Sequence, residues 1–211
     1  MKAFPIGFVT SGRHLLIVGG GWETEGRLKH AVMFEWARIR MVLLKPDPAI
    51  SALASTDTRV EVVERAATED DVAWAHLVIE DSGSRAIAEQ LDRWCATHRV
   101  PLNAMDKPDL CDLYYTSLLF RDPLVISITS GGDAPVVSSF LRKSLDKMVG
   151  PGWAMAANLL SEARKNLPSG QARMDLLKKI ARHERLPELI ERNDEVGLKQ
   201  LLDDELRSLR T

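Results

Sequence analysis

Three consecutive glycines, Gly19, Gly20 and Gly21, end an apolar run and precede a segment with a helical period. A glycine turn between a strand and a helix lets backbone N–H groups approach a pyrophosphate, and the helix N-terminus adds partial positive charge. Gly19 and Gly21 occupy the first two positions of the GxGxx[G/A] pattern, whereas Thr24 occupies the third and Gly26 follows two residues later. The turn therefore indicates either a dinucleotide site or a tight turn of an α/β fold.

Two features of this turn argue for weak cofactor binding. Trp22 is bulky for a residue that faces a nucleotide, and Thr24 replaces the small residue that lets helix and strand pack closely. The acidic residue that binds a ribose lies about 20 residues after the glycines in such sites. Here the second strand and its end offer basic residues, Arg38, Arg40 and Lys45, and Asp47 follows only beyond a proline. We expect NAD to bind weakly and the double change Trp22→Asp with Thr24→Ala to tighten binding.

A carboxylate, Asp106, directly follows the predicted strand end Asn103–Met105. Doubly wound sheets bind their ligands at the carboxyl ends of the strands, which is where a catalytic acid or base is expected. A loop aspartate is also common as a turn or cap residue. From the residues alone, Asp106 is either a proton acceptor or a structural turn residue.

The Ser130-Gly131-Gly132 sequence forms a second turn between a predicted strand and a predicted helix. Its N–H groups, together with the dipole of the following helix, can bind an anion. The same residues can equally cap that helix. Both interpretations stay open on the residues alone.

Histidine and cysteine, the usual ligands of transition metals, are dispersed along the chain. The five histidines show no HxxxH spacing, and the two cysteines, Cys95 and Cys111, form no CxxC pair. We therefore expect no metal ligands and two free thiols. No GxSxG, phosphate-loop or Cys/His nucleophile pattern is present.

The elements that must position these residues alternate in type along the first hundred residues. Expected strands end in glycine or proline turns, and the segments between them have helical periods. Expected strands cover 14–19, 39–44, 60–63 and 76–79, and expected helices cover 22–36, 68–75 and 84–97. This alternation is typical of a parallel sheet covered on both faces, because each parallel crossover needs a covering element. The fold class is α/β and Rossmann-like.

The pattern changes after about residue 100. A hairpin is expected within 113–129 and a helix over 135–148, and only helical periods follow, over 153–166, 172–183 and 194–209. We therefore divide the chain into a Rossmann-like dinucleotide-binding domain (1–112), a dimerisation segment (113–150) and a helical domain (151–211). The second segment has many apolar residues, which predicts a homodimer unless the helical tail covers them.

Composition excludes several classes of protein. Of 211 residues, 45% are hydrophobic and 27% are charged, which excludes wholesale disorder and a collagen-like fibre. No apolar run approaches the roughly 18 to 20 residues of a membrane span, so we expect no membrane partner. A formal net charge of −2 gives no basic footprint for nucleic acid. The N-terminus lacks the apolar core of a signal peptide, and we expect a cytoplasmic protein.

Taken together, these blocks make the sequence similar to the siroheme synthase N-terminal family. That family contains precorrin-2 dehydrogenases, and many of its members are also sirohydrochlorin ferrochelatases. The blocks that carry the resemblance are Pro5-Ile6, the strand and glycines at 15–21, Asn103–Asp106 with Pro108, the stretch 121–135, and a helix containing Leu141-Arg142. The resemblance runs along nearly the whole chain and implies a Rossmann domain, a central dimerisation segment and a C-terminal helical domain.

The resemblance also implies roles for individual residues. The family's catalytic aspartate falls on Asp106, its substrate-contacting asparagine on Asn103, and the serine of its SGG turn on Ser130. Its NAD contacts fall within the glycine turn and at the end of the second strand: Gly19, Gly20, Gly21, Trp22, Glu23, Leu44 and Lys45. The implied reaction is NAD-dependent oxidation of precorrin-2 to sirohydrochlorin, followed in many members by insertion of Fe²⁺ or Co²⁺ in the same cleft.

The tetrapyrrole substrate carries many carboxylates, which calls for a local positive site. The backbone amides of Gly131 and Gly132, with Arg142, are the expected contributors. The departures from the family lie on the cofactor side, at Thr24 and at residues 80–83, where Glu-Asp-Ser-Gly replaces a Thr-Asp pair. They leave open a chelatase or a non-enzymatic tetrapyrrole-binding protein with a degenerate NAD site, and also a structural or regulatory Rossmann dimer.

Overall fold

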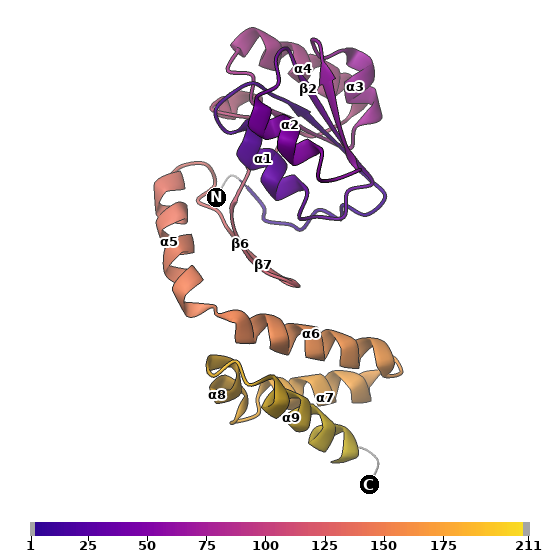
Figure 1. Ribbon diagram of the computed structural model, residues 1–211, viewed down its shortest axis with the longest axis vertical. Coiled ribbons are helices and arrows are strands. Elements are labelled where there is room, and N and C mark those ends of the chain that lie inside the picture. The colour runs from indigo at the N-terminus through magenta and orange to yellow at the C-terminus, as the bar shows by residue number, and fades with distance from the viewer. Residues whose placement is uncertain (1–2, 209–211) are drawn as a thin grey trace. The chain divides into compact units, whose positions relative to one another are not determined.

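The computed structural model describes residues 3–208, which form two compact units that meet in the sequence between Tyr115 and Thr116 (Figure 1). The first unit holds a five-stranded parallel sheet with the strand order β3-β2-β1-β4-β5. Its strands are β1 (His14–Val18), β2 (Arg38–Leu43), β3 (Val60–Glu64), β4 (Leu77–Glu80) and β5 (Leu102–Ala104). The chain runs outward from β1 to β3 and then crosses to β4 on the other side of β1. This reversal creates a crevice at the carboxyl ends of β1 and β4.

Helices cover both faces of this sheet, as the apolar strands predict. They are α1 (Thr24–Ala31), α2 (Pro48–Ala54), α3 (Glu69–Trp74) and α4 (Arg85–His98), followed by the 3-10 helix η1 (Pro108–Leu110). In β1, Leu15 and Ile17 pack with Leu28 of α1, whereas Leu16 packs on the opposite face with Leu91 of α4. Because both faces are buried, the strand is a continuous apolar run rather than an alternating one. The expected Rossmann-like α/β fold is confirmed.

One expected helix end in this unit was wrong, and one helix was not expected at all. The helix expected over 22–36 ends at Ala31, because the guanidinium of Arg59 donates to the carbonyl oxygens of Val32 (2.8 Å) and Phe34 (2.6 Å) and fixes a non-helical turn there. Helix α2 is not among the expected helices, because the prolines on both sides of Asp47 predict a turn there. Asp47 instead caps α2, accepting a hydrogen bond from the Ala49 N–H at 2.7 Å, and Pro48 occupies the first helical position.

The second unit begins with an antiparallel hairpin and continues as helices. The hairpin joins β6 (Ser117–Arg121) to β7 (Leu124–Ile128), and the helices are α5 (Pro135–Met148), α6 (Pro151–Asn166), α7 (Gln171–Ala181), α8 (Leu186–Glu191) and α9 (Glu195–Ser208). The hairpin and α5 lie where the sequence predicts them, whereas α8 was missed. Residue 209 of the last expected helix lies outside the described residues. The division at 112 and 150 stays a prediction.

Helices α6–α9 enclose a small core of their own. Leu176 and Ile180 of α7 pack with Leu198 and Leu201 of α9, and all four are nearly inaccessible to solvent. Across residues 3–208, no helix combines the length and apolar character needed to cross a bilayer.

Candidate functional site at the carboxyl edge of the sheet

Sheet register brings the residues of interest to one edge of the first unit. Val18, the last residue of β1, pairs with Glu80 at the end of β4, and Glu80 pairs with Ala104 at the end of β5. The glycine turn, Asp81 and Asp106 each follow one of these strand ends by one or two residues. They therefore lie at the crevice where doubly wound folds bind ligands.

The glycine turn needs glycine for two different reasons. Gly20 has φ +121°, a backbone conformation that residues with a side chain rarely adopt. At Gly21 the limit is space, because a Cβ would lie 2.2 Å from Oδ1 of Asp81 and 2.4 Å from its carbonyl oxygen. The crowding expected from Trp22 is not seen within the turn, since that residue is 81% exposed.

From its size, Thr24 was expected to hold the strand and the helix apart, but it does not. It is completely buried, and the absent side chain of Gly19 gives it room, because a Cβ there would lie 2.4 Å from the Thr24 methyl group. The Thr24 hydroxyl accepts from the Gly20 N–H at 3.0 Å and donates to the Asp81 carboxylate at 2.9 Å. Thr24 therefore ties the turn to the end of β4.

Asp81 is the residue that sequence reasoning missed at this turn. Its Oδ2 accepts from the Glu23 N–H at 3.0 Å, and its carbonyl oxygen accepts from the Gly21 N–H at 2.5 Å. Three amides that a pyrophosphate would use, those of Gly20, Gly21 and Glu23, thus already donate within the protein. The signal available in the sequence was an acidic residue directly after β4, at a position where the chain departs from the family that it resembles.

A cavity of about 290 Å³ adjoins the turn on the α4 side of the sheet. It reaches from the glycine turn across the carboxyl ends of β2 and β3 to α4, and its lining includes Gly19, Gly20, Leu44, Lys45, Arg65, Ser82, Gln90 and Trp94. Apolar walls with a few polar groups are typical of a small-molecule site. The predicted cofactor residues Leu44 and Lys45 therefore do line a cavity that the glycines also reach.

One of the basic residues that line this cavity, Arg65, is already paired with an acidic residue. Arg65 is bound by Asp71 through two hydrogen bonds of 2.6 and 2.8 Å. Burial by itself raises the pKa of Asp71, but hydrogen bonds from Arg65 and Thr68 outweigh it and hold that pKa far below its usual range. Asp47 caps α2 through one of its carboxylate oxygens. At the glycine turn, Asp81 accepts hydrogen bonds from the N–H groups of Gly21 and Glu23.

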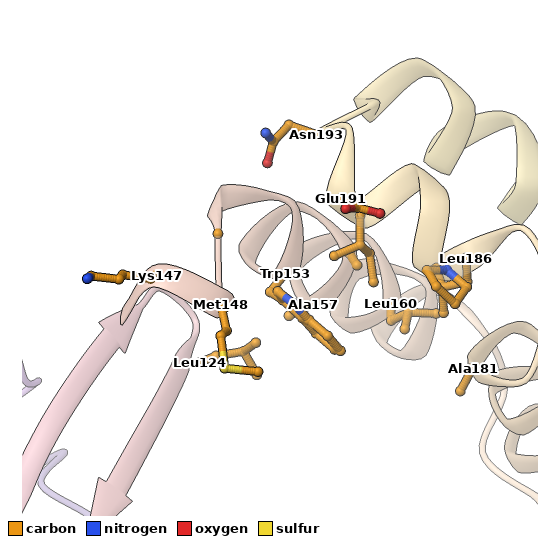
Figure 2. Close-up of a pocket in the computed structure, with 14 residues that line it drawn as sticks. Leu124, Lys147, Met148, Trp153, Ala157, Leu160, Ala181, Leu186, Glu191 and Asn193 are labelled. Carbon is orange, nitrogen blue, oxygen red and sulfur yellow. The ribbon is translucent and has the colours of Figure 1, made fainter. Parts of the chain in front are cut away.

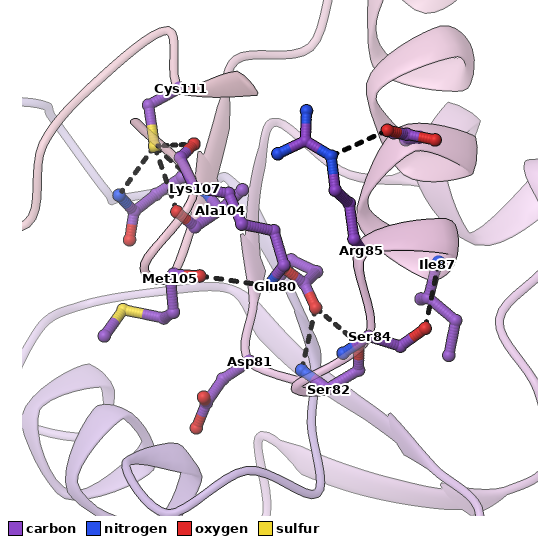
Figure 3. A network of polar contacts seen from close by, with 12 residues as sticks. Glu80, Asp81, Ser82, Ser84, Arg85, Ile87, Ala104, Met105, Lys107 and Cys111 are labelled. Atoms are coloured by element: carbon purple, nitrogen blue, oxygen red, sulfur yellow. Dashed lines mark hydrogen bonds and ion pairs between the residues drawn. The ribbon is translucent and has the colours of Figure 1, made fainter. Parts of the chain in front are cut away.

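On the other side of Asp81, a buried ion pair closes the end of β4 (Figure 3). Glu80 is fully buried, and its carboxylate accepts from the Lys107 ammonium at 3.0 Å and from the Ser82 N–H at 2.8 Å. The same ammonium donates to the carbonyl oxygen of Met105 at 3.0 Å. Lys107 thus ties the loop after β5 to β4.

Asp106 lies between Met105 and Lys107, and both of these neighbours are held in place by contacts with other residues. It has φ +56° and is exposed, and its carboxylate has no hydrogen bond or ion pair with any residue of the described chain. A cap residue would show such a bond, so the structure gives Asp106 no capping role. Met105 on one side contacts the Arg27 guanidinium through its sulfur at 3.2 Å, and Lys107 on the other is held by Glu80. A free carboxylate is thus presented on a fixed turn.

Asn103, the residue predicted to contact the substrate, is buried in β5. The residue is only 4% exposed, and its side-chain amide nitrogen donates to the Leu113 carbonyl oxygen at 3.0 Å. Its buried Oδ1 has no partner among the described residues. Asn103 therefore holds the segment after η1 against β5, and its contact with a substrate stays a prediction.

A cluster on α1, also missed from the sequence, packs beside the loop after β5. The Arg27 guanidinium stacks on the Tyr115 ring at 3.9 Å and forms an ion pair with Glu23. The Tyr115 hydroxyl lies 3.0 Å from Nδ1 of His30, and burial raises the pKa of that hydroxyl. Tyr115 lies 85 positions after His30 in the sequence, which is why no motif revealed the cluster. They fix the face of α1 that contacts Met105.

The remaining predicted residues belong to the second unit. The Ser130 hydroxyl accepts from the N–H of Ala134, the residue before α5, at 2.9 Å, and the Gly131 N–H donates to the Thr129 hydroxyl at 3.0 Å. The Gly131 amide therefore already has a partner within the chain, and its expected role as an anion donor stays a prediction. Gly132, with φ +90°, and Arg142, half-buried on α5, have no such bond among the described residues.

A cavity of about 770 Å³ in the second unit has a different character (Figure 2). Trp153, Leu160 and Leu186 are among its apolar walls, and its only charged lining residues are Lys147 and Glu191. Two charges of opposite sign on an apolar wall do not match a polyanionic macrocycle. Size alone therefore does not make this cavity the tetrapyrrole site.

Cys95 and Cys111 are free, as predicted. Burial raises the pKa of the Cys95 thiol to about 12. Between residues 3 and 208, no three His, Cys, Asp or Glu side chains converge in a way that holds a metal ion.

Comparison with known proteins identifies relatives of the whole arrangement. The family described as "Putative NAD(P)-binding" matches residues 7–117, just over half of the chain. The "Siroheme synthase" of Psychrobacter sp. (strain PRwf-1) is 28% identical over 80% of this chain and 34% of its own length. That of Pseudomonas entomophila (strain L48) is 29% identical over 78% of this chain and 35% of its own length. The chain thus spans about a third of these relatives.

A solved structure named "SirC, precorrin-2 dehydrogenase" has the same fold. It superimposes with a TM-score of 0.75 over 97% of this chain and 100% of its own, at 17% sequence identity. At that identity the likeness establishes the fold, including the C-terminal helices, rather than the chemistry.

Proposed function

This chain belongs to the family described as "Putative NAD(P)-binding", the N-terminal family of siroheme synthases, and from that premise we propose that it oxidises precorrin-2 to sirohydrochlorin. The observation that carries the proposal is Asp106. Its carboxylate is exposed, has no partner in the described chain, and is presented on a fixed turn at the ligand-binding edge of the sheet.

Oxidation of precorrin-2 removes two hydrogens from the macrocycle, one as a hydride and one as a proton. When bound, NAD supplies the hydride acceptor. The Asp106 carboxylate accepts the proton, and general-base assistance of this kind contributes about 10² to 10⁴ in rate. Because Asp106 has no partner in the described chain, no existing bond has to break before it takes up the proton. The bond that loses the proton leaves its electron pair in the macrocycle, where this pair forms the new double bond of the product.

Other residues of the first unit orient the reactants. Leu44 and Lys45 line the cavity that accommodates the nucleoside half of NAD, and Gly20, which also lines it, leaves room for the cofactor to approach. For the carboxylates of the macrocycle we propose Arg142, with the amide of Gly132, as binding groups of the second unit.

A second function, metal insertion, uses the same carboxylate. Entry of Fe²⁺ or Co²⁺, as substrate, requires two pyrrole N–H protons to leave the macrocycle, and Asp106 accepts them in turn. One observation favours chelation without dehydrogenation: Asp81 occupies the place of the pyrophosphate, which weakens the cofactor site but leaves Asp106 untouched.

An absorbance assay separates these functions. Purified protein is mixed with precorrin-2, NAD is added first, and Co²⁺ or Fe²⁺ follows in a separate step. Conversion at the first step supports the dehydrogenase. A spectral change only when metal is added to prepared sirohydrochlorin supports the chelatase alone, and tight binding without turnover supports a carrier.

We also propose that the chain forms a homodimer through the second unit. Its α5 helix leaves Val136, Val137 and Phe140 respectively 79%, 63% and 73% exposed. Apolar side chains gathered on one helix face are typical of a protein interface. Light scattering that gives a monomer mass at micromolar concentration would exclude the dimer.

A further inference from the structure

The carboxylate of Asp81 lies at the N-terminus of α1, inside the first unit. It is only 4% exposed and accepts from the Glu23 N–H at 3.0 Å and from the Thr24 hydroxyl at 2.9 Å. Within residues 3–208 it forms no ion pair with a lysine, arginine or histidine. Its charge is therefore balanced by backbone and hydroxyl dipoles alone.

Those dipoles are the groups that bind a phosphate in a Rossmann fold. A helix N-terminus presents free N–H groups and about half a positive charge, so it is a ready anion site. Here the chain's own carboxylate fills that site. The packing is close, since a Cβ on Gly21 would lie 2.2 Å from Oδ1 of Asp81.

A dinucleotide cannot share this position with Asp81. Its pyrophosphate needs the Glu23 N–H that Asp81 already accepts, and it would bring further negative charge against a buried carboxylate. Like charges at contact distance in a partly buried site repel strongly. The adenosine half meets no such conflict, because its cavity extends away from Asp81 toward Lys45 and Trp94.

We propose that Asp81 is an internal competitor for the pyrophosphate and the residue that sets dinucleotide affinity in this chain. The inference deepens the proposed function, on whose dinucleotide site it rests. Binding requires the Asp81 carboxylate to leave the α1 N-terminus, which then offers the Glu23 N–H and the Thr24 hydroxyl to the cofactor. The free energy needed to displace the carboxylate lowers the affinity of the chain for the dinucleotide.

Calorimetric titration of the full chain with NAD, NADP and adenosine tests this directly. Asp81→Ala removes the competing anion, and Asp81→Asn removes its charge while keeping its shape. We expect about tenfold tighter binding of both dinucleotides to Asp81→Ala, a smaller gain for Asp81→Asn, and unchanged binding of adenosine; tenfold corresponds to about 1.4 kcal/mol, within the range of helix-terminus effects.

A matched control is Asp194, whose carboxylate accepts from the Gly197 N–H at 2.8 Å in the second unit. Asp194→Asn removes a similar bond and should leave all three affinities unchanged. Circular dichroism checks that each variant is folded. Equal, measurable NAD affinity in the parent and both Asp81 variants overturns the inference but not the proposed function. Absence of dinucleotide binding in every protein overturns this inference together with the dehydrogenase, leaving only the chelatase.

Discussion

Replacing Lys107 with methionine should destabilise the first unit and slow turnover together. The change keeps most of the side chain's length but leaves the fully buried Glu80 carboxylate without its cation. Removing one partner of a buried pair costs about 3–5 kcal/mol. Here the Ser82 N–H still donates to Glu80 at 2.8 Å, and the Lys107 side chain is itself 11% exposed, so the loss should lie at or just below the lower end of this range. We expect a loss of about 2–3 kcal/mol.

Thermal denaturation followed by circular dichroism measures this loss. At about 2–4 °C per kcal/mol for a chain of this size, the melting temperature should fall by roughly 5–10 °C. Turnover should fall as well, because the same ammonium holds the Met105 carbonyl beside Asp106. The double variant Glu80→Met with Lys107→Met removes the buried charge and should recover most of the stability.

The surface pair Arg85 and Glu89 provides the comparison, since both side chains are about half exposed. Arg85→Met should change stability by less than about 1 kcal/mol, as exposed pairs generally do. If Lys107→Met cost no more than this surface variant, Glu80 would not depend on the ammonium. The account of how the Asp106 turn is held would then be wrong.

Two further predictions concern acid stability and assembly. The folded pKa of Asp71 is depressed, so its contribution to stability is present above the unfolded pKa of about 3.9 and is lost as pH falls below it; Asp71→Asn should flatten urea-measured stability between about pH 5 and pH 2, and a parallel decline in parent and variant would contradict this. Phe140→Asp, which places a charge on a 73% exposed ring position of α5, should convert the proposed dimer to a monomer in light scattering without lowering the melting temperature of the monomer, and a retained dimer would exclude α5 from the interface.

Much of the fold could be predicted from local patterns because most strands and helices of the first unit carry their own signal. The apolar run before Gly19 and the helical period of 68–75 are examples, and the structure confirms them as β1 and α3. Helix α2 was missed because a proline can mark either a turn or the first residue of a helix, and Pro48 is the first residue of α2. The end of α1 was missed because it depends on Arg59, which is distant in sequence.

The candidate site could be predicted only in part, for a similar reason. Asp106 and the glycine turn are each marked by their place after a strand, so position alone revealed them. The contacts of Asp81 with Glu23 and of Glu80 with Lys107 join residues 58 and 27 positions apart. Only the strand order brings them together, so no local spacing could reveal them. The prediction that Trp22 limits cofactor binding is replaced by one that Asp81 does.

Asp106→Asn tests the central claim most directly. Asparagine tolerates the φ of +56° at this position, whereas alanine would be strained there by about 1 kcal/mol, so the amide is the matched variant. Precorrin-2 oxidation with NAD is followed by absorbance in parent and variant at equal substrate occupancy. We predict a rate lower by about 10² or more with an unchanged melting temperature. An unchanged rate in the folded variant would remove Asp106 from the mechanism and contradict the proposed function.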